Sequence, residues 1–528
     1  MTGQNGSSPA LFVWDAETCD KVQRIKLKKG ARGISCVGFS SDGKYIACAD
    51  MHNDHNVRTY SVSNGQCVYE DKGGPDKIYD LCWSKSECCF ATGGKNHIKF
   101  WWPEKRESKK GIFCGKGKLT SFACVGYGQE TCYSGGCNAL IYKWGGRSCQ
   151  GTIKAHSSGF ICTINVNGGK IVSGGRDGQI IVIDEASFNI EHKINMGGLV
   201  RAVDYNGTNI VAGLRSGDIK VMDLDGSNQK QIMASHSDGE VWTCEELSDG
   251  RILTAGDDNK VLCWEANPSV DNIAKCTEVS SENRKAPKGG ASTLSPLPAS
   301  QQSRSAVVLP DGSSVAIARN DGYVAIRQMG SNNDTTVLKD SKEWIEVMKV
   351  SPCKTYLAVG SHDNTIYVYN ISDWSLVGKC TAHNSFICNL DWDEESKYIR
   401  SVCGAHELLF HTIPDCQQDK GGASATTGTK WATNSCKFGW LVDGVFPPGT
   451  SGPHVNGVDI SADQKYVMTA DNYGLVNLYN NPCRQGSKAV SFAGHSEHVQ
   501  RAYFTKAGTG VISVGGYDQT LMRWDLQE

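Results

Sequence analysis

Residues 236–264 read HSDGEVWTCEELSDGRILTAGDDNKVLCW, and residues 495–524 follow the same plan as HSEHVQRAYFTKAGTGVISVGGYDQTLMRW. In both stretches a histidine precedes an alternating apolar strand and a turn. A second strand with Ser or Thr follows, then a turn with Asp, then a strand that ends in Trp. Alternation of apolar and polar residues with a period of two is typical of half-buried β-strands. Both stretches therefore predict short antiparallel strands joined by tight turns.

The same plan recurs along the chain at a period of about 40 residues. The repeats begin near Ile34, Lys77, Leu119, Gly159, Val200 and Glu240. Four short strands cannot bury both faces of their sheet, whereas sheets stacked radially about an axis can. Dipeptides such as Asp42-Gly43 and Asp177-Gly178 supply the positive-φ positions that hairpin turns need. The sequence predicts an all-β protein of propeller blades with very little helix.

The repeats divide into two groups. Residues 266–303 break the pattern with several prolines and many serines, a composition typical of a linker or a long inter-strand insertion. We predict two tandem β-propellers, the first of about seven blades at residues 11–265 and the second of about six at residues 304–528. Residues 1–10 are predicted to be a disordered N-terminus.

The first blade is incomplete in this scheme. Leu11–Lys29 supplies only two strands, and an unclosed sheet would expose edges prone to mispairing. We expect a distant segment to complete the blade, either within Ala291–Gln302 or from Lys430–Phe446.

The strand ends resemble WD repeats. Trp14-Asp15 and Trp524-Asp525 are literal Trp-Asp dipeptides. Two blades carry residues that resemble the hydrogen-bonded tetrad of this class: His236, Thr254, Asp258 and Trp264, then His495, Ser513, Asp518 and Trp524. A partial set comprises His156, Ser173 and Asp177, with Ile183 in place of Trp. A catalytic triad occurs once per site, whereas this spacing recurs, so we interpret these residues as structural.

Several irregular stretches are similar to the tandem propeller unit of the echinoderm microtubule-associated protein-like family. They include NHIKFWW at residues 96–102 and WLVDGVFPPGTSGPHVNGVDI at residues 440–460. Within the latter, residues 444–447 (GVFP) resemble a Gly-Val/Ile-Trp-Pro element of that family, with Phe replacing Trp. The resemblance extends from Leu11 to Asp525 and is closest to one module of the family's multi-module branch.

This resemblance implies a non-enzymatic microtubule-associated protein that binds the tubulin lattice through propeller surfaces. It also implies that the protein lies in the cytoplasm, on the cytoskeleton, and that the axoneme of a cilium or flagellum is one such location. Other axonemal or microtubule-associated proteins are then further partners. Family members often carry an N-terminal trimerising coiled coil, whereas ten polar residues precede Leu11 here, so coiled-coil trimerisation is not expected. Three alternatives stay open: a tandem-propeller actin regulator, a generic WD-repeat scaffold for a multiprotein complex, and an enzyme with its active site in a propeller's central pocket. The last needs acids or a nucleophile at non-repeating positions, and we find none.

Composition sets further limits. The 528 residues include 54 Lys and Arg against 56 Asp and Glu, a formal net charge of −2, so no whole-molecule field would attract nucleic acid or a membrane. Neither a signal peptide nor a run of 18 apolar residues is present, which predicts a soluble cytosolic protein. The 23 cysteines include no Cys-x-x-Cys pair, so we expect apolar core thiols and no catalytic residue, cofactor or metal.

The clearest local charge feature is residues 103–118, PEKRESKKGIFCGKGK, with a net charge of +4. Its cations are the candidate partner-binding residues: Lys105, Arg106, Lys109, Lys110, Lys116 and Lys118. Such a loop can engage an acidic tubulin surface through screened attraction, and the alternative is a solvated hairpin. A second basic cluster, Lys21–Arg32, alternates like an exposed edge strand protected by lysines.

Overall fold

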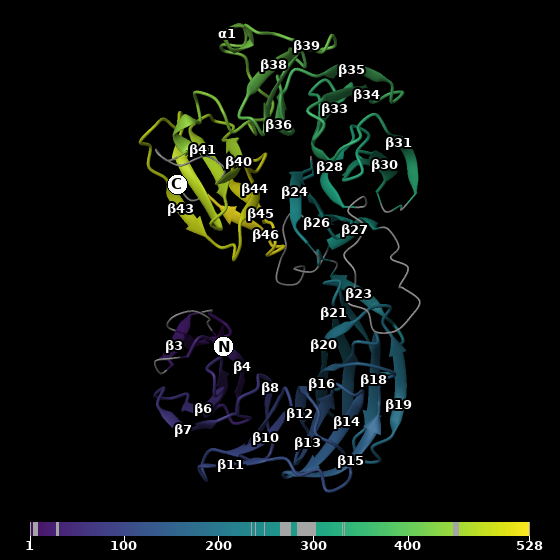
Figure 1. The fold of residues 1–528 in the computed structure, drawn as a ribbon, viewed down its shortest axis with the longest axis vertical. Helices are drawn as coiled ribbons and strands as arrows, with labels where there is room; N and C mark the ends of the chain where they lie inside the picture. The colour runs from purple at the N-terminus through teal and green to yellow at the C-terminus, as the bar shows by residue number, and fades with distance from the viewer. Residues whose placement is uncertain are drawn as a thin grey trace. The chain divides into compact units, whose positions relative to one another are not determined.

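The computed structural model describes residues 2–3, 9–18, 20–27, 31–233, 235–237, 239–247, 249–264, 276–281, 302–329, 331, 333–446 and 454–526. The chain divides into two compact units, residues 1–232 and residues 233–528. Within the described ranges nearly every element is a β-strand (Figure 1). The exceptions are the short helix α1 (Gly422–Ala425) and a 3-10 turn at Asp443–Val445. No described helix is long and apolar enough to span a membrane.

The first unit contains the following strands: β1 (Thr2–Gly3), β2 (Ala10–Trp14), β3 (Lys21–Lys26), β4 (Ile34–Phe39), β5 (Tyr45–Asp50), β6 (Asn56–Ser61), β7 (Cys67–Lys72), β8 (Ile78–Trp83), β9 (Phe90–Gly94), β10 (His97–Trp102), β11 (Glu107–Lys110), β12 (Phe122–Tyr127), β13 (Thr131–Gly136), β14 (Leu140–Gly145), β15 (Ser148–Lys154), β16 (Ile161–Asn167), β17 (Lys170–Gly175), β18 (Gln179–Asp184), β19 (Ile190–Asn195), β20 (Val200–Tyr205), β21 (Asn209–Leu214), β22 (Ile219–Asp223) and β23 (Lys230–Met233).

The second unit contains the following strands: β24 (Val241–Glu246), β25 (Ile252–Gly256), β26 (Lys260–Trp264), β27 (Cys276–Ser281), β28 (Ser303–Val308), β29 (Ser314–Arg319), β30 (Val324–Gln328), β31 (Asp334–Leu338), β32 (Ile345–Val350), β33 (Tyr356–Ser361), β34 (Ile366–Asn370), β35 (Leu376–Cys380), β36 (Ile387–Trp392), β37 (Tyr398–Cys403), β38 (Leu408–Thr412), β39 (Gln417–Gln418), β40 (Val455–Ile460), β41 (Tyr466–Asp471), β42 (Leu475–Asn480), β43 (Val490–Ala493), β44 (Val499–Phe504), β45 (Gly510–Gly515) and β46 (Leu521–Asp525).

The strands form antiparallel sheets of consecutive hairpins, as the turn signals predicted. Ten sheets have four strands in chain order, and the sheets β1–β3 and β44–β46 have three among the described residues. The predicted turn glycines adopt the left-handed backbone, with φ of 70° at Gly43 and 78° at Gly178. The core lies between neighbouring sheets, where large side chains such as Trp101, Trp144 and Trp392 are completely buried. The all-β blade architecture is confirmed.

Aspartates on the first strands join neighbouring sheets. Asp80 of β8 accepts the backbone N–H of Val125 on β12 at 2.8 Å, and Asp459 of β40 accepts that of Phe504 on β44 at 2.9 Å. In the second unit, first strands of neighbouring sheets lie next to one another from β24 through β28 and β32 to β36, and from β40 through β44 back to β24.

An irregular segment, residues 431–446, lies between the sheets β36–β39 and β40–β43; we call it the wedge. Asp391 of β36 accepts the N–H of Cys436 at 3.0 Å, the same bond that first strands make elsewhere. At the wedge's other end, Leu441 accepts the N–H of Cys483 at 2.8 Å. The wedge therefore replaces a blade within the second unit. Its predicted role in completing the first blade, through Lys430–Phe446, is wrong.

The first blade gains its third strand locally. Thr2–Gly3 forms β1, which pairs with β2. This pairing differs from the predicted disordered N-terminus, of which residues 1 and 4–8 lie outside the described residues. The other predicted donor, Ala291–Gln302, lies outside them up to residue 301. β3 is the exposed outer strand that the alternating lysines predicted.

The boundary between the units differs from the predicted one. Sheet β24–β27 packs with the second unit, because Val241 and Cys244 contact Ile512 and Val514 of β45 in one buried cluster. Its outer strand β27 occupies part of the predicted linker 266–303, and the rest of that segment up to residue 301 lies outside the described residues. The described residues thus hold six sheets in each unit, and the sequence had assigned residues 241–264 to the first.

Candidate functional site

The predicted basic residues lie along the outer strand of one blade in the first unit. Lys105 and Arg106 occupy the tight turn between β10 and β11, and Lys109 and Lys110 lie on β11 itself. Lys116 and Lys118 follow in the connection to β12. We call these six residues the basic edge. Part of the predicted loop is thus a strand, which pairs with β10 from Lys99↔Lys110 to Trp102↔Glu107.

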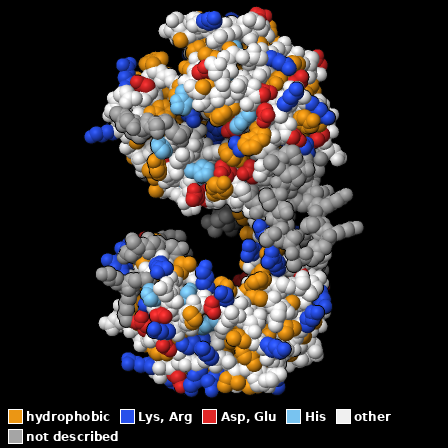
Figure 2. Space-filling model, viewed as in Figure 1, with side chains coloured by type: hydrophobic (Ala, Val, Ile, Leu, Met, Phe, Trp, Pro, Cys, Tyr) orange, Lys and Arg blue, Asp and Glu red, His pale blue; other side chains and the backbone are white. Residues whose placement is uncertain are grey.

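Few carboxylates neutralise the basic edge. Lys109 forms an ion pair with Glu107, and Lys99 on the neighbouring strand pairs with Asp71 at 3.3 Å. Within the described ranges, no ion pair is found for the other five cations of the edge: Lys105, Arg106, Lys110, Lys116 and Lys118. Figure 2 shows Lys and Arg side chains gathered over β10 and β11. The edge is therefore a local source of positive potential.

The two units carry opposite net charge. Residues 1–232 contain 29 Lys and Arg against 22 Asp and Glu, a net charge of +7, whereas residues 233–528 contain 25 against 34, a net charge of −9. The near-neutral total conceals this asymmetry. A polyanion would be attracted by the first unit and repelled by the second.

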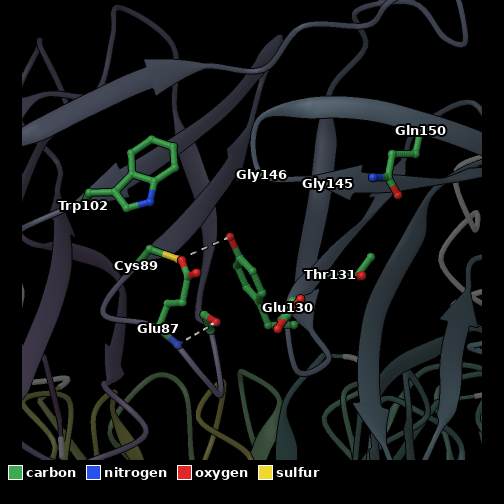
Figure 3. Close-up of a pocket in the computed structure, with 10 residues that line it drawn as sticks. Glu87, Cys89, Trp102, Glu130, Thr131, Gly145, Gly146 and Gln150 are labelled. Carbon is green, nitrogen blue, oxygen red and sulfur yellow. Dashed lines mark hydrogen bonds between the residues drawn. The ribbon is translucent and has the colours of Figure 1, made fainter.

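A hollow of about 260 Å³ lies in the first unit next to Trp102, the last residue of β10 (Figure 3). It is lined by Ser84, Glu87, Cys89, Trp102, Tyr127, Glu130, Thr131, Gly145, Gly146 and Gln150. Figure 3 shows Glu87, Cys89 and Glu130 near one another, with Trp102 and Gln150 on opposite sides. Burial raises the pKa of Cys89, so this side chain is a thiol and a weak nucleophile at neutral pH. The lining includes no histidine to act as its base.

The predicted tetrads are assembled by direct hydrogen bonds. His236 binds Asp258 through Nδ1 at 2.9 Å and Thr254 through Nε2 at 2.9 Å, and Trp264 donates to the same Thr254 hydroxyl at 2.8 Å. In the last blade, Nδ1 and Nε2 of His495 bind Asp518 at 3.0 Å and Ser513 at 2.8 Å. Trp524 again donates to the serine at 2.8 Å.

This geometry is structural. The Ser or Thr hydroxyl in each tetrad is shared between the His and the Trp, and both histidines are buried. His156 binds Asp177 at 2.9 Å and Ser173 at 3.0 Å in the same way, although Ile183 replaces Trp. Thr254, Ser513 and Ser173 are all buried, so their hydroxyls are not accessible to a substrate.

Sequence reasoning missed two related sets in the first unit. Trp101 donates to the Thr92 hydroxyl at 2.9 Å, and His97 binds the same hydroxyl at 2.8 Å. Trp144 donates to Ser134 at 2.9 Å. The signal was present, because Phe100-Trp101 and Lys143-Trp144 end strands of the repeat, but His97 enters from a different turn than the tetrad histidines.

Family models match most of the chain. Models of the echinoderm microtubule-associated protein first and second β-propellers match residues 1–205 and 290–526, and a model of the WD domain, G-beta repeat, matches residues 227–265. Residues 206–289, between the two propeller models, include the sheet β24–β27, which the structure places in the second unit.

Individual proteins are similar over almost the full chain. A "Ciliary WD repeat-containing protein ctxp80" of Euplotoides octocarinatus is 46% identical, with 99% of this chain and 74% of that protein covered. "Echinoderm microtubule-associated protein-like 1" of Rattus norvegicus is 27% identical, with coverage of 98% and 63%. The "77 kDa echinoderm microtubule-associated protein" of Lytechinus variegatus is 28% identical, with coverage of 98% and 77%. The chain thus spans less than two thirds of the rat protein.

Proposed function

The chain belongs to the echinoderm microtubule-associated protein family of tandem WD-repeat propellers, and from that premise we propose that it is a non-enzymatic microtubule-associated protein. Its binding surface is the first unit, with the basic edge as the part that contacts the acidic lattice of tubulin. The protein works in the cytoskeleton, and the ciliary name of the Euplotoides relative supports a place in the axoneme.

The observation that carries this proposal is the basic edge with its five cations that lack ion-pair partners in the described part of the chain. Exposed cations contribute to association mainly through screened, long-range attraction, which accelerates encounter and weakens as salt is added. The net charge of +7 on the first unit extends the same attraction beyond the edge itself. A propeller surface of this kind binds without a deep cleft.

Co-sedimentation tests the proposal. The whole chain is mixed with stabilised microtubules or with actin filaments at about 50 and about 200 mM salt, a range over which the screening length falls below about 10 Å. We expect the protein to pellet with microtubules and to be released by salt. Pelleting with actin filaments alone would support a tandem-propeller actin regulator instead. Pelleting with neither filament would contradict the proposal and favour a generic WD-repeat scaffold of a multiprotein complex.

A charge-reversal variant locates the surface. Lys105, Arg106, Lys109 and Lys110 are changed together to Glu. Exposed ion pairs are each worth about 0.4 kcal/mol, so four lost pairs give about 1.5 kcal/mol, or roughly tenfold in affinity. The matched control reverses four exposed lysines of the second unit: Lys342, Lys420, Lys430 and Lys488. Equal loss in both variants, or none in the first, would contradict the assignment.

A further inference from the structure

The sheet β36–β39 departs from the tetrad pattern in a way that gathers metal ligands. His383, Cys403 and Glu407 each place one ligand atom within 4.8 Å of the other two. His383 lies in the turn before β36, Cys403 ends β37, and Glu407 precedes β38. Imidazole nitrogen, thiolate sulfur and carboxylate oxygen are the three ligand types that protein zinc sites use.

Cys403 stands where the tetrad blades have glycine. Its register partner is Ile387, and the equivalent pairs are Ile161↔Gly175, Val241↔Gly256 and Val499↔Gly515. In those blades a Cβ at the glycine would lie 2.3, 3.2 and 2.6 Å from the Nδ1 atom of the tetrad histidine. In the sheet β36–β39, the thiol of Cys403 therefore lies next to His383, at a position where the tetrad blades have no side chain.

Glu407 takes the place of the tetrad aspartate. It accepts the N–H of Asn384, the residue after the histidine, at 3.0 Å, as Asp258 accepts that of Ser237 at 3.0 Å. The longer side chain does not restore the tetrad's central bond. The distance from His Nδ1 to the carboxylate is 2.9 to 3.0 Å in the two tetrads and in the partial set of His156, but 3.5 Å between His383 and Glu407.

Two of the three separations between these atoms are close to those of a zinc site, and one of the two is a hydrogen bond from Cys403 to Glu407. By the usual zinc bond lengths, ligand atoms of a tetrahedral site lie about 3.4 Å apart for N···O and about 3.6 Å for S···O. Here His383 Nδ1 lies 3.5 Å and Cys403 Sγ 3.2 Å from Glu407 Oε2. Nδ1 of His383 is buried and has no hydrogen-bond partner in the described part of the structure.

Neighbouring side chains hold two of the three ligands in place. Nε2 of His383 binds the Ser401 hydroxyl at 2.7 Å, which fixes the ring and leaves Nδ1 as the free nitrogen. Asn384 donates to Glu407 from its backbone N–H at 3.0 Å and from its side-chain amide, which orients the carboxylate. A metal bound at Cys403 would displace the thiol proton to solvent.

The third departure is His411, which stands where the tetrad has Trp. It is completely buried on β38, and neither ring nitrogen has a hydrogen-bond partner among the described residues. Its ring centroid lies 6.1 Å from that of His383. Unpaired nitrogens in a core cost stability, so a histidine here is unexplained by packing alone.

We propose that His383, Cys403 and Glu407 supply three ligands of a zinc site in the sheet β36–β39 of the second unit. The sequence predicts no metal site, because its cysteines show no zinc-ribbon spacing. The site would tie the turn before β36 to the end of β37 and the start of β38, the role that the hydrogen-bonded tetrad has in the blades of His236 and His495.

The experiment measures metal binding by the purified full chain after chelator treatment. Zinc uptake is counted by mass spectrometry of the metal, and cobalt is titrated as a spectroscopic probe. We expect one zinc per chain and a thiolate-to-cobalt charge-transfer band. Cys403→Ser should abolish the band and lower zinc affinity at least tenfold, the least that disturbing even a second-shell partner costs.

Two further variants keep the result interpretable. Cys403→Gly restores the residue of the tetrad blades and should fold, as judged by circular dichroism, but should not bind cobalt through sulfur. Cys353→Ser removes an exposed thiol elsewhere in the same unit and should bind like the wild type. Absence of the charge-transfer band from the wild type, or a band that persists in Cys403→Ser, would overturn the proposal and leave Glu407 as a hydrogen-bond acceptor only.

Discussion

Replacement of Asp391 by Asn is expected to open the wedge. The Asp391 side chain is fully buried and accepts hydrogen bonds from Lys349 at 2.9 Å and from Arg400 at 3.1 Å. It also accepts the backbone N–H groups of Ser435 at 2.9 Å and Cys436 at 3.0 Å. Asn preserves the shape but removes the anion, so two partly buried cations lose their counter-charge.

The magnitude follows from the burial of these groups. Breaking a buried ion pair by removing one partner costs about 3–5 kcal/mol. The side chains of Lys349 and Arg400 remain 20% and 15% exposed, so water compensates part of the loss and we take about 3 kcal/mol. For a unit of 296 residues, an unfolding entropy of about 2.1 cal/mol/K per residue converts this to a fall in Tm of about 5 °C.

The assay is native-state hydrogen exchange read by mass spectrometry, because a single global unfolding free energy is poorly defined for a chain of two units. Peptides that cover residues 431–446 should exchange about a hundredfold faster in Asp391→Asn, since 3 kcal/mol is about two powers of ten. The matched control is Asp459→Asn. Asp459 accepts the N–H of Phe504 at 2.9 Å, but no ion pair is found for it among the described residues.

We expect the control to leave exchange of the wedge unchanged. Equal exchange in the wild type and in Asp391→Asn would refute the reasoning, because the wedge would then be held by its apolar contacts alone. The lysine and arginine lower the pKa of Asp391 far below its usual range. Its contribution is therefore present above the unfolded value of about 4 and is lost as the pH falls below it.

Three further predictions follow from individual contacts. Thr254→Val should lower the opening free energy of the sheet β24–β27 by about 2–4 kcal/mol in native-state hydrogen exchange, because His236 and Trp264 each lose a buried partner. Thr365→Val, at a half-buried hydroxyl, should change exchange in this sheet little. Gly444→Ala should destabilise the wedge, because a Cβ there would lie 2.0 Å from the carbonyl oxygen of Arg484. Gly151→Ala is the control, because no heavy atom lies within 4 Å of the added Cβ. Equal Tm values for the two variants would contradict this account. Burial raises the pKa of Asp459 to about 7, so its contribution to stability is present below about pH 4 and is lost as the pH rises through 7. The Tm of Asp459→Asn relative to that of the wild type should therefore increase from about pH 6 to about pH 8. A Tm difference that stays constant over this range would rule this out.

The features that sequence reasoning could find are those set by local spacing. Asp-Gly turns and period-two alternation determine each hairpin, because the interacting residues are near neighbours in the chain. The tetrads are visible for the same reason: His236 and Thr254 lie 18 residues apart and Asp258 is four further on, a spacing that the hairpin itself imposes. The predicted outer position of β3 also required only alternation.

Features that depend on the closing of a ring could not be found in this way. Residues 241–264 carry the pattern of any blade, and their place in the second unit is fixed by contacts with residues such as Gly516, whose carbonyl accepts the N–H of Val241 at 3.2 Å. The wedge lacks the repeat pattern altogether, yet its Cys436 makes the inter-sheet bond of a first strand. Only the 45-residue step from Asp391 to Cys436, equal to that from Asp80 to Val125, hinted at it.

The residues of the basic edge could be predicted from the sequence, but their ion pairing could not. The six cations of the basic edge are evident in the sequence, but their freedom from ion pairs depends on where the surrounding carboxylates fall, and Glu107 binds Lys109 alone. The division of charge between the units was hidden because it depends on the boundary at residue 232. The metal ligands were hidden because His383, Cys403 and Glu407 converge from two turns and a strand end without a recognised spacing.

The proposed function assigns different tasks to the two units. An acidic lattice attracts the first unit, with its net charge of +7, and repels the second, with −9, so association should be directed by the first. The second unit then remains available to other partners, and its exposed aromatic side chains, Tyr473 at 69% and Tyr517 at 63%, are of the kind that anchor protein interfaces. If instead the control reversal of second-unit lysines weakened microtubule binding as strongly as the basic-edge reversal, this division of tasks would fail while the fold and the family would stand.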